Sequence, residues 1–318
     1  MSDDKIENPI SYSQLQALED DFEDVELELL RHQAKLSKDI YAKREAVISQ
    51  IPSFWPLVLE QSPPELDEYI QPTDSAVLLS SLTKLSVERF ELPSGGDPRS
   101  LAIRFEFAEN EYFSDSVLEK KFWWRHHRDG WAGLVSEPVK INWKSKDKDL
   151  TGGMLDLVIQ VAAEEKAAGK KTSEADSDAK KALREAMDNT GLGGVSFFAW
   201  FGFRGRDVSE EESKEAYKLE LEKRKKRKAG EEVDEEDEED DEADDDLDYE
   251  WEVFPIADDI AVAIAEDVWP GAIKYFLAAQ ENDALSDLEF EESDEEMAEG
   301  EDEDAAEDHP SKKRKADE

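Results

Sequence analysis

The stretch Ser13–Ile51 reads SQLQALEDDFEDVELELLRHQAKLSKDIYAKREAVISQI and contains neither proline nor glycine. Its apolar residues recur at spacings of three and four, which is the spacing of one face of an α-helix. Ser13 and Gln16 match the capping box found at helix starts, and Pro52 interrupts the helix. The stretch therefore predicts one helix of roughly 38 residues, about 57 Å long at 1.5 Å per residue.

A helix of this length is longer than a small domain is wide, so one domain does not cover its apolar stripe. A second long helix is not visible in the sequence, and we expect the stripe to form a coiled coil with a second copy of the chain. The alternative is pairing within the chain. His32 lies on the stripe, where a polar residue helps to fix the register. The candidate dimer-interface residues are Leu15, Leu18, Phe22, Val25, Leu29, His32, Leu36, Ile40 and Val47.

The region after Pro52 predicts an α+β domain. Short proline-rich helical pieces come first, at 54–60, 65–70 and 74–82. Alternating apolar residues then predict strands at 84–92, 101–107, 117–124 and 139–143. Four such strands predict one antiparallel sheet with one apolar face packed against helices.

The later sequence alternates between apolar and charged stretches. Residues 144–190 are rich in Lys, Ala, Ser and Asp, and we expect a largely mobile insertion with one helix near Asp178–Met187. Apolar character returns at 195–203, and Ser209–Lys228 predicts a charged, solvated helix. Isoleucines spaced by four predict a helix at Ile256–Val268, followed by a short one from Pro270.

These observations divide the chain into four parts. We expect a disordered N-terminus at 1–12, a dimerisation helix at 13–52, a folded domain at 53–280 and a disordered acidic tail at 281–318. Within the domain, mobile insertions are expected at about 145–194 and 204–250.

The net charge of −44 is concentrated in two short runs. Glu231–Glu250 holds 16 acids and no base, and Glu281–Glu318 holds 18 acids against four bases. Such runs repel themselves and stay extended, and their natural partners are cationic macromolecules such as histones and ribosomal proteins. The alternative is a solubilising tail with no partner. Direct nucleic-acid binding and membrane binding are not expected, because both need a basic surface.

The sequence offers no catalytic constellation. It has no cysteine and four histidines, and adjacent His126 and His127 lack the ligand spacing of a zinc helix. Gly191–Gly194 lacks the Lys-Ser/Thr of a phosphate loop. The N-terminus has no secretory pattern. We expect no enzyme, no cofactor and no metal.

Two basic clusters are typical of nuclear-import signals. We expect both to be exposed and flanked by disorder; the alternative is pairing with the neighbouring acidic runs. The candidate residues are Lys223, Arg224, Lys225, Lys226, Arg227 and Lys228 in the first cluster, and Lys312, Lys313, Arg314 and Lys315 in the second.

A series of short motifs resembles, in order, those of the nucleosome assembly protein family, and within it the SET-like branch. The motifs are YAKR at 41–44, IPSFW at 51–55, RFEF at 104–107, NEYF at 110–113, VLEKKF at 117–122, INWK at 141–144, SFFAWF at 196–201, EDVWP at 266–270 and YFL at 275–277. The resemblance covers roughly 38–148 and 195–280. One departure is the stretch of about 50 residues between the SFFAWF and EDVWP motifs, where the SET-like branch usually has a short loop.

The resemblance implies a homodimer joined by the long helices, with an α+β "earmuff" domain on each. It also implies that Asp258, Asp259, Glu266 and Asp267 are candidate histone-binding residues. Asp258 and Asp259 lie near a helix start, where the helix dipole alone explains them. Glu266 and Asp267 lie in the last turn, where the dipole opposes them by about 0.3–1 kcal/mol each.

The function expected from the resemblance and the charge pattern is an ATP-independent histone chaperone in the nucleus, shuttling with the cytoplasm. Its expected partners are core histones, of the central or the outer pair, with import receptors and histone-modifying enzymes as further partners. The rival is an acidic regulator or adaptor of a phosphatase or a histone-modifying enzyme. A weaker third reading is a carrier of other basic proteins.

Overall fold

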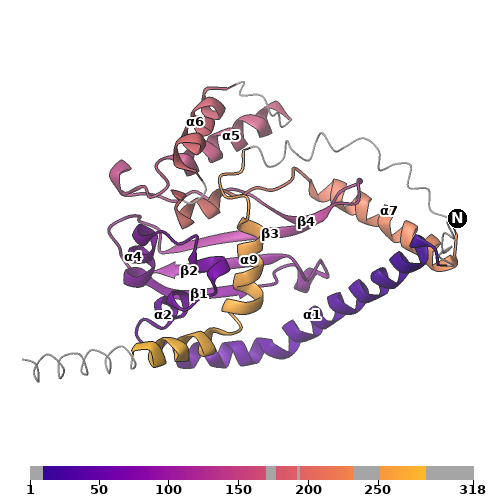
Figure 1. Ribbon diagram of the computed structural model, residues 1–318, viewed down its shortest axis with the longest axis horizontal. Coiled ribbons are helices and arrows are strands. Elements are labelled where there is room, and N and C mark those ends of the chain that lie inside the picture. Colours follow the sequence, from indigo (N-terminus) through magenta and orange to yellow (C-terminus); the bar gives the residue numbers. More distant parts are fainter. Residues whose placement is uncertain (1–9, 170–176, 192–193, 232–250, 284–318) are drawn as a thin grey trace, which may run out of the picture.

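The computed structural model describes residues 10–169, 177–191, 194–231 and 251–283. A long helix, α1 (Tyr12–Ile48, 37 residues), runs along one side of an α+β body and projects beyond it (Figure 1). The predicted length is confirmed. The predicted start is wrong by two residues, because Ser11 is the N-cap and forms the capping box with Gln14. The acidic tail after residue 283, which includes the cluster at Lys312–Lys315, lies outside the described residues. Residues 232–250 of the first acidic run also lie outside them.

Four antiparallel strands form one sheet in the order β1-β2-β3-β4. They are β1 (Leu82–Glu88), β2 (Leu101–Phe107), β3 (Val117–His126) and β4 (Ala132–Ser136). The predicted sheet is confirmed, but its predicted fourth strand is wrong. β3 turns back through a tight loop in which the His127 amide donates to the Trp131 carbonyl, and β4 follows directly.

Residues 139–143 pack on the core instead of joining the sheet. The Val139 amide donates to the Phe201 carbonyl at 2.8 Å, and Trp143 forms an isolated bridge with Phe113. This packing explains their alternating apolar pattern, which resembles that of a strand.

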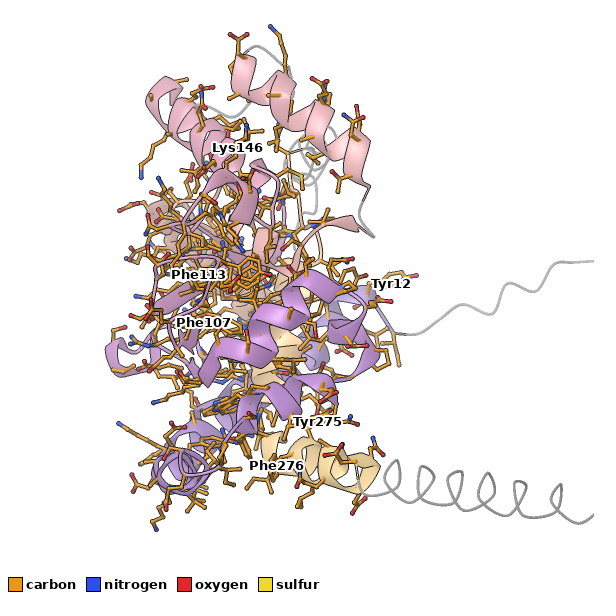
Figure 2. All side chains as sticks on the ribbon, turned by 90° about the vertical axis from the view of Figure 1, so that its left-hand side faces the viewer. Tyr12, Phe107, Phe113, Lys146, Tyr275 and Phe276 are labelled. Carbon is orange, nitrogen blue, oxygen red and sulfur yellow. The ribbon has the colours of Figure 1, made fainter. Side chains whose placement is uncertain are left out.

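The core lies between the sheet and a buried 3₁₀ segment, η4 (Phe197–Gly202). Phe105 of β2 contacts three rings of η4 with centroids 6.0 Å apart, and Trp200 among them is fully buried. Phe107 and Phe113 extend the same cluster with centroids 5.0 Å apart, as Figure 2 shows inside the body. The apolar stretch at 195–203 therefore forms the part of the core that packs against the sheet.

The helix predicted near Asp178–Met187 is confirmed as α6 (Asp178–Thr190). The mobile insertion predicted around it is wrong at α5 (Met154–Ala168), which packs on α6 and contacts η4. Met154, Leu155, Val158 and Val161 are buried. Their helical spacing lies among many Ala and charged residues, so that composition hides the pattern.

The remaining helices cover the body. α2 (Phe54–Glu60), α3 (Pro64–Asp67) and α4 (Pro72–Ser81) confirm the three predicted short pieces. The predicted helix at Ile256–Val268 is α9 (Ala257–Ala263), which continues as a π-helical turn, η6 (Ile264–Val268). A further helix begins at 272 and continues to 283. In Figure 1, α9 crosses the direction of the strands.

One face of the charged helix α7 (Glu210–Ala229) packs against α1 and β3, while most of its other residues are exposed. The predicted solvated helix is therefore wrong for the face on α1 and β3 and confirmed for the rest. Figure 1 shows α7 descending from the sheet to meet the N-terminal part of α1, so the two helices and the body enclose a triangle.

A buried lysine on β3 connects three segments of the body. The Lys120 ammonium donates to the carbonyls of Glu137, Phe201 and Phe203 at 2.8, 3.0 and 2.6 Å. Burial lowers the pKa of Lys120 to about 7, and the charges of Glu252 and Glu137 act in the opposite direction. Lys120 therefore joins β3 to the residue that follows β4 and to the C-terminal end of η4.

We expect Lys120→Met to destabilise the fold by about 2–4 kcal/mol, because buried carbonyls lose their donor while the volume is preserved. Urea denaturation of the purified protein measures the change. The control is Lys121→Met, since Lys121 is an exposed neighbour paired with Glu119, and its loss should change stability by no more than about 0.5 kcal/mol. Equal stability of the two variants would contradict this role.

Candidate functional site

Two acids predicted as ligand contacts lie in the first turn of α9. Asp259 is exposed and Asp258 is half-buried. No side chain forms an N-cap hydrogen bond on this seven-residue helix. The two acids of its first turn are therefore the groups that interact with the positive end of the helix dipole. Burial and the neighbouring Asp259 raise the pKa of Asp258 to about 6, although backbone amides act against the shift. At neutral pH Asp258 is therefore ionised at a cost to the free protein.

The other two acids lie in η6 and have partners within the chain. Glu266 is 3.1 Å from an Arg89 guanidinium nitrogen. Asp267 accepts a hydrogen bond of 2.6 Å from the Tyr275 hydroxyl. Burial, this bond and the charge of Asp267 raise the pKa of Tyr275 to about 12. These donors offset the unfavourable helix dipole that the sequence predicts, yet both carboxylates remain exposed.

The four acids follow one helical segment but do not converge on one point. Asp259 and Glu266 are exposed, as is Val262 between them, and spacings of three and four place all three on one face. We call Asp258, Asp259, Glu266 and Asp267 the acidic row. The row is an open acidic surface.

Arg44 of α1 fixes the end of the acidic row to the long helix. It donates to the carbonyls of Trp269 and Pro270 at 2.5 and 3.3 Å. Its guanidinium lies 4.6 Å from the Trp269 ring centroid, and the Tyr41 and Trp269 rings are 4.0 Å apart. Trp269 is thus half-buried in this contact and holds the end of the acidic row at a fixed position relative to α1.

The outer face of α1 is an uncovered apolar stripe. The eight apolar candidates for the dimer interface have exposed fractions between 46% at Leu15 and 64% at Phe22, and His32 is exposed with them. The opposite face is buried against the chain itself at Asp20, Leu27 and Ile48. The helix therefore has one face for its own subunit and one face that the described chain leaves open.

The first basic cluster lies on α7, and its expected full exposure is wrong. Arg224 and Arg227 are largely buried in ion pairs with α1, whereas Lys225 and Lys226 are exposed. The acids that pair with them come from α1 and from Glu220 of α7, both within the described residues. The sequence did not reveal this contact, because Asp20 and Arg227 are 207 positions apart.

The described residues contain no group of three or more His or acidic side chains arranged to hold a metal ion. In the same part of the chain, no helix combines the length and apolarity needed to cross a membrane.

Replacing Asp258 should stabilise the free protein in a pH-dependent way. Because its folded-state pKa lies above the ordinary value of 3.8, ionisation lowers stability as pH rises through about 4 to 6. Asp258→Asn removes this effect, which is worth about 1–2 kcal/mol and exceeds the lost dipole interaction. We expect a higher melting temperature than wild type at pH 7.5 and little difference at pH 4. Equal melting temperatures at pH 7.5 would contradict the assignment.

Comparisons with known proteins agree on one family. A family model described as nucleosome assembly protein (NAP) matches residues 49–279. A putative nucleosome assembly protein of Schizosaccharomyces pombe is 34% identical over 145 residues, which cover 42% of this chain and 57% of that protein. Protein SET of Drosophila melanogaster is 34% identical over 117 residues, covering 35% of this chain and 39% of that protein. This chain thus spans less than two thirds of these two relatives.

A longer match is to vacuolar protein sorting-associated protein 75 of Saccharomyces cerevisiae, which is 25% identical over 300 residues, covering 92% of this chain and 86% of that protein. A crystal structure of Vps75 has a TM-score of 0.51 at 22% identity, covering 84% of this chain and 96% of that one, and shows likeness of fold. The family model spans α2 through the helix that begins at 272, which is the whole α+β body. The chain therefore belongs to the nucleosome assembly protein family.

Proposed function

We propose that this protein is an ATP-independent histone chaperone that binds core histones, shields their basic surfaces and promotes nucleosome assembly and disassembly. The observation that carries the proposal is the family match across the α+β body. The name of one relative, a putative nucleosome assembly protein, supports the same role. The proposal includes no catalytic step and no cofactor, since competition between contacts is sufficient to transfer a client.

The acidic row is the proposed selective contact for histones. Its carboxylates are exposed or half-buried, and Asp258 is ionised at neutral pH against the effect of burial. A histone cation beside Asp258 relieves that cost, so part of the binding energy comes from a group that is unfavourable in the free protein. Glu266 and Asp267 exchange their partners Arg89 and Tyr275 for histone donors.

The acidic runs supply the remaining affinity. Each exposed ion pair contributes about 0–1 kcal/mol, so strong binding requires many pairs. At physiological salt, screening over roughly 8 Å limits the runs to histone surfaces that they touch. The acidic row then determines selectivity, while Glu231–Glu250 and Glu281–Glu318 determine affinity and its salt dependence.

The working unit is a homodimer joined through the outer face of α1. Eight large apolar side chains along one helix face are exposed to solvent, which a stable monomer avoids. The inner face is occupied by the chain's own body, so the outer face is available to a second copy. Arg44 holds each acidic row at a fixed position relative to this seam.

The family role in nucleosome assembly supports a nuclear location, and the basic clusters Lys223–Lys228 and Lys312–Lys315 are the proposed import signals. We also propose that the protein shuttles with the cytoplasm and that it prefers the central or the outer histone pair. Histone-modifying enzymes are further proposed partners.

We expect Phe22→Glu with Leu29→Glu to convert the dimer into monomers, because each introduces a charge into the apolar seam of both subunits. Light scattering after size exclusion should show half the wild-type mass. Leu79→Glu on α4 is the control, since Leu79 is also an exposed leucine but lies away from α1. A wild-type mass that is already monomeric would overturn the dimer proposal.

We expect removal of 284–318 to weaken histone binding at about 150 mM salt and to flatten its salt dependence, without abolishing binding.

Neutralising the acidic row with Asp258→Asn, Asp259→Asn, Glu266→Gln and Asp267→Asn in the full chain should reduce discrimination between the central and outer histone pairs. Titration of both pairs across a salt series measures the two effects. If binding vanishes with 284–318 and never discriminates, the protein is a polyanionic adaptor of a phosphatase or a histone-modifying enzyme.

A further inference from the structure

The C-terminal half of α7 is held against α1 by charge. Arg227 forms a two-pronged contact with Asp20, with nitrogen–oxygen distances of 3.0 and 3.1 Å, and also donates to Glu220 at 2.6 Å. Arg227 and Asp20 are 7% and 6% exposed. Because the pair is shielded from water, it is screened by salt much less than a surface pair.

A second arginine of α7 extends the contact along α1. Arg224 pairs with Glu23 and lies 3.4 Å from Asp20 and 3.5 Å from Asp24. Arg99, from the connection between β1 and β2, reaches the same Glu23 at 2.6 Å. Although burial acts to raise it, hydrogen bonds from Arg99 and Arg224 bring the pKa of Glu23 below its ordinary value. The inner face of α1 is thus an acidic strip that binds three arginines.

Apolar packing contributes little to this half of α7. The buried residues of the helix are Ser213, Ala216 and Arg227. The first two belong to the N-terminal half, where the Ser213 hydroxyl accepts from the His126 amide at 3.0 Å and Tyr217 packs on His126 with ring centroids 4.7 Å apart. The N-terminal half is therefore fixed to β3, while the C-terminal half depends on its ion pairs with α1.

The arginines of this contact belong to the basic cluster Lys223–Lys228. An acidic groove on a receptor binds such a cluster only if several cations of the cluster lie on one accessible side of the helix. Here Arg224 and Arg227 face α1, and the exposed members are Lys225, Lys226 and Lys228, of which Lys228 lies 2.7 Å from Asp21. The carboxylates of α1 therefore pair with Arg224, Arg227 and Lys228, which a receptor would also need.

We propose that the basic face of α7 is a docking surface for the acidic groove of an import receptor, and that Asp20 and Glu23 of α1 are its intramolecular competitors. The receptor binds only when the C-terminal half of α7 leaves α1. This rests on the proposed import role of Lys223–Lys228, and it is independent of histone binding by the acidic row. Removing the two acids weakens the hold of α1 on the helix, because Arg227 then keeps only Glu220 of its own helix and Arg224 keeps Glu220 and the more distant Asp24.

Hydrogen exchange of the full chain tests the competition. Asp20→Asn with Glu23→Gln should speed amide exchange at 218–229 at least tenfold and leave 210–217 unchanged. Glu19→Gln with Glu26→Gln removes the same charge from exposed positions of α1 and should have no effect. Asp20→Glu with Glu23→Asp, which keeps both negative charges, should leave exchange slow and so exclude general damage from substitution at these positions. Equal exchange in the first two variants overturns the competition.

Nuclear accumulation of the full chain fused to a fluorescent protein tests the docking surface. Lys312, Lys313, Arg314 and Lys315 are first replaced by alanine, so that import depends on α7. We expect a low nuclear-to-cytoplasmic ratio, a rise of at least threefold on adding Asp20→Asn with Glu23→Gln, and loss of the rise on further adding Lys225→Ala with Lys226→Ala. A high ratio before the acids are removed overturns the competition by α1.

The two measurements separate the possible failures. If exchange at 218–229 accelerates but the nuclear ratio does not rise, α7 is released and its basic face is not an import surface. That outcome overturns the import role of Lys223–Lys228 together with this proposal. Histone titration with the Lys225→Ala, Lys226→Ala variant should match wild type, so the chaperone proposal stands or fails on its own measurement.

Discussion

The packing of Trp200 against Phe105 is the contact on which the rest of this structure depends. It joins the sheet to the 3₁₀ segment η4. The Trp200 indole also donates to the Ala257 carbonyl at 2.8 Å, at the start of α9. One side chain thus connects the sheet to the helix that carries the acidic row. Asp74 of α4 supports the same segment by accepting from the Ser196 hydroxyl and the Phe197 amide.

From this core a continuous series of contacts reaches the long helix. α9 passes into η6, and Trp269 after η6 lies against Tyr41 and Arg44 of α1. At its other end α1 is attached through ion pairs to α7, which β3 anchors. The acidic row and the apolar stripe therefore belong to one framework, and their positions relative to each other are fixed.

Periodicity predicted most of this framework from sequence. The apolar spacing of α1, the alternation in β2 and the isoleucines of α9 each report burial on one side, and burial is what a periodic pattern records. Family resemblance added the candidate acids and the expected shape. The position of β4 was missed because it is only five residues long and contains Gly133. α5 was missed because its buried residues lie within an Ala- and Lys-rich composition.

The docking of α7 on α1 could not be predicted from periodicity or from family resemblance, for a physical reason. A contact made by arginines and carboxylates leaves no apolar period, and the same residues are equally compatible with a solvated helix. The partner of Glu266 is of this kind too, since Arg89 lies 177 positions away from it. Charged contacts between distant segments become visible only when the backbone places them together.

The π-helical turn at Ile264–Val268 has an evolutionary consequence. A π turn is an α-helix with one additional residue, so loss of a single residue there would restore a regular helix. Because the π turn absorbs the additional residue within itself, the segments on either side keep nearly the same orientation with or without it, and Trp269 stays against Arg44. Lineages of this chain can therefore gain or lose a residue in this turn and still keep α1 attached to the end of the acidic row.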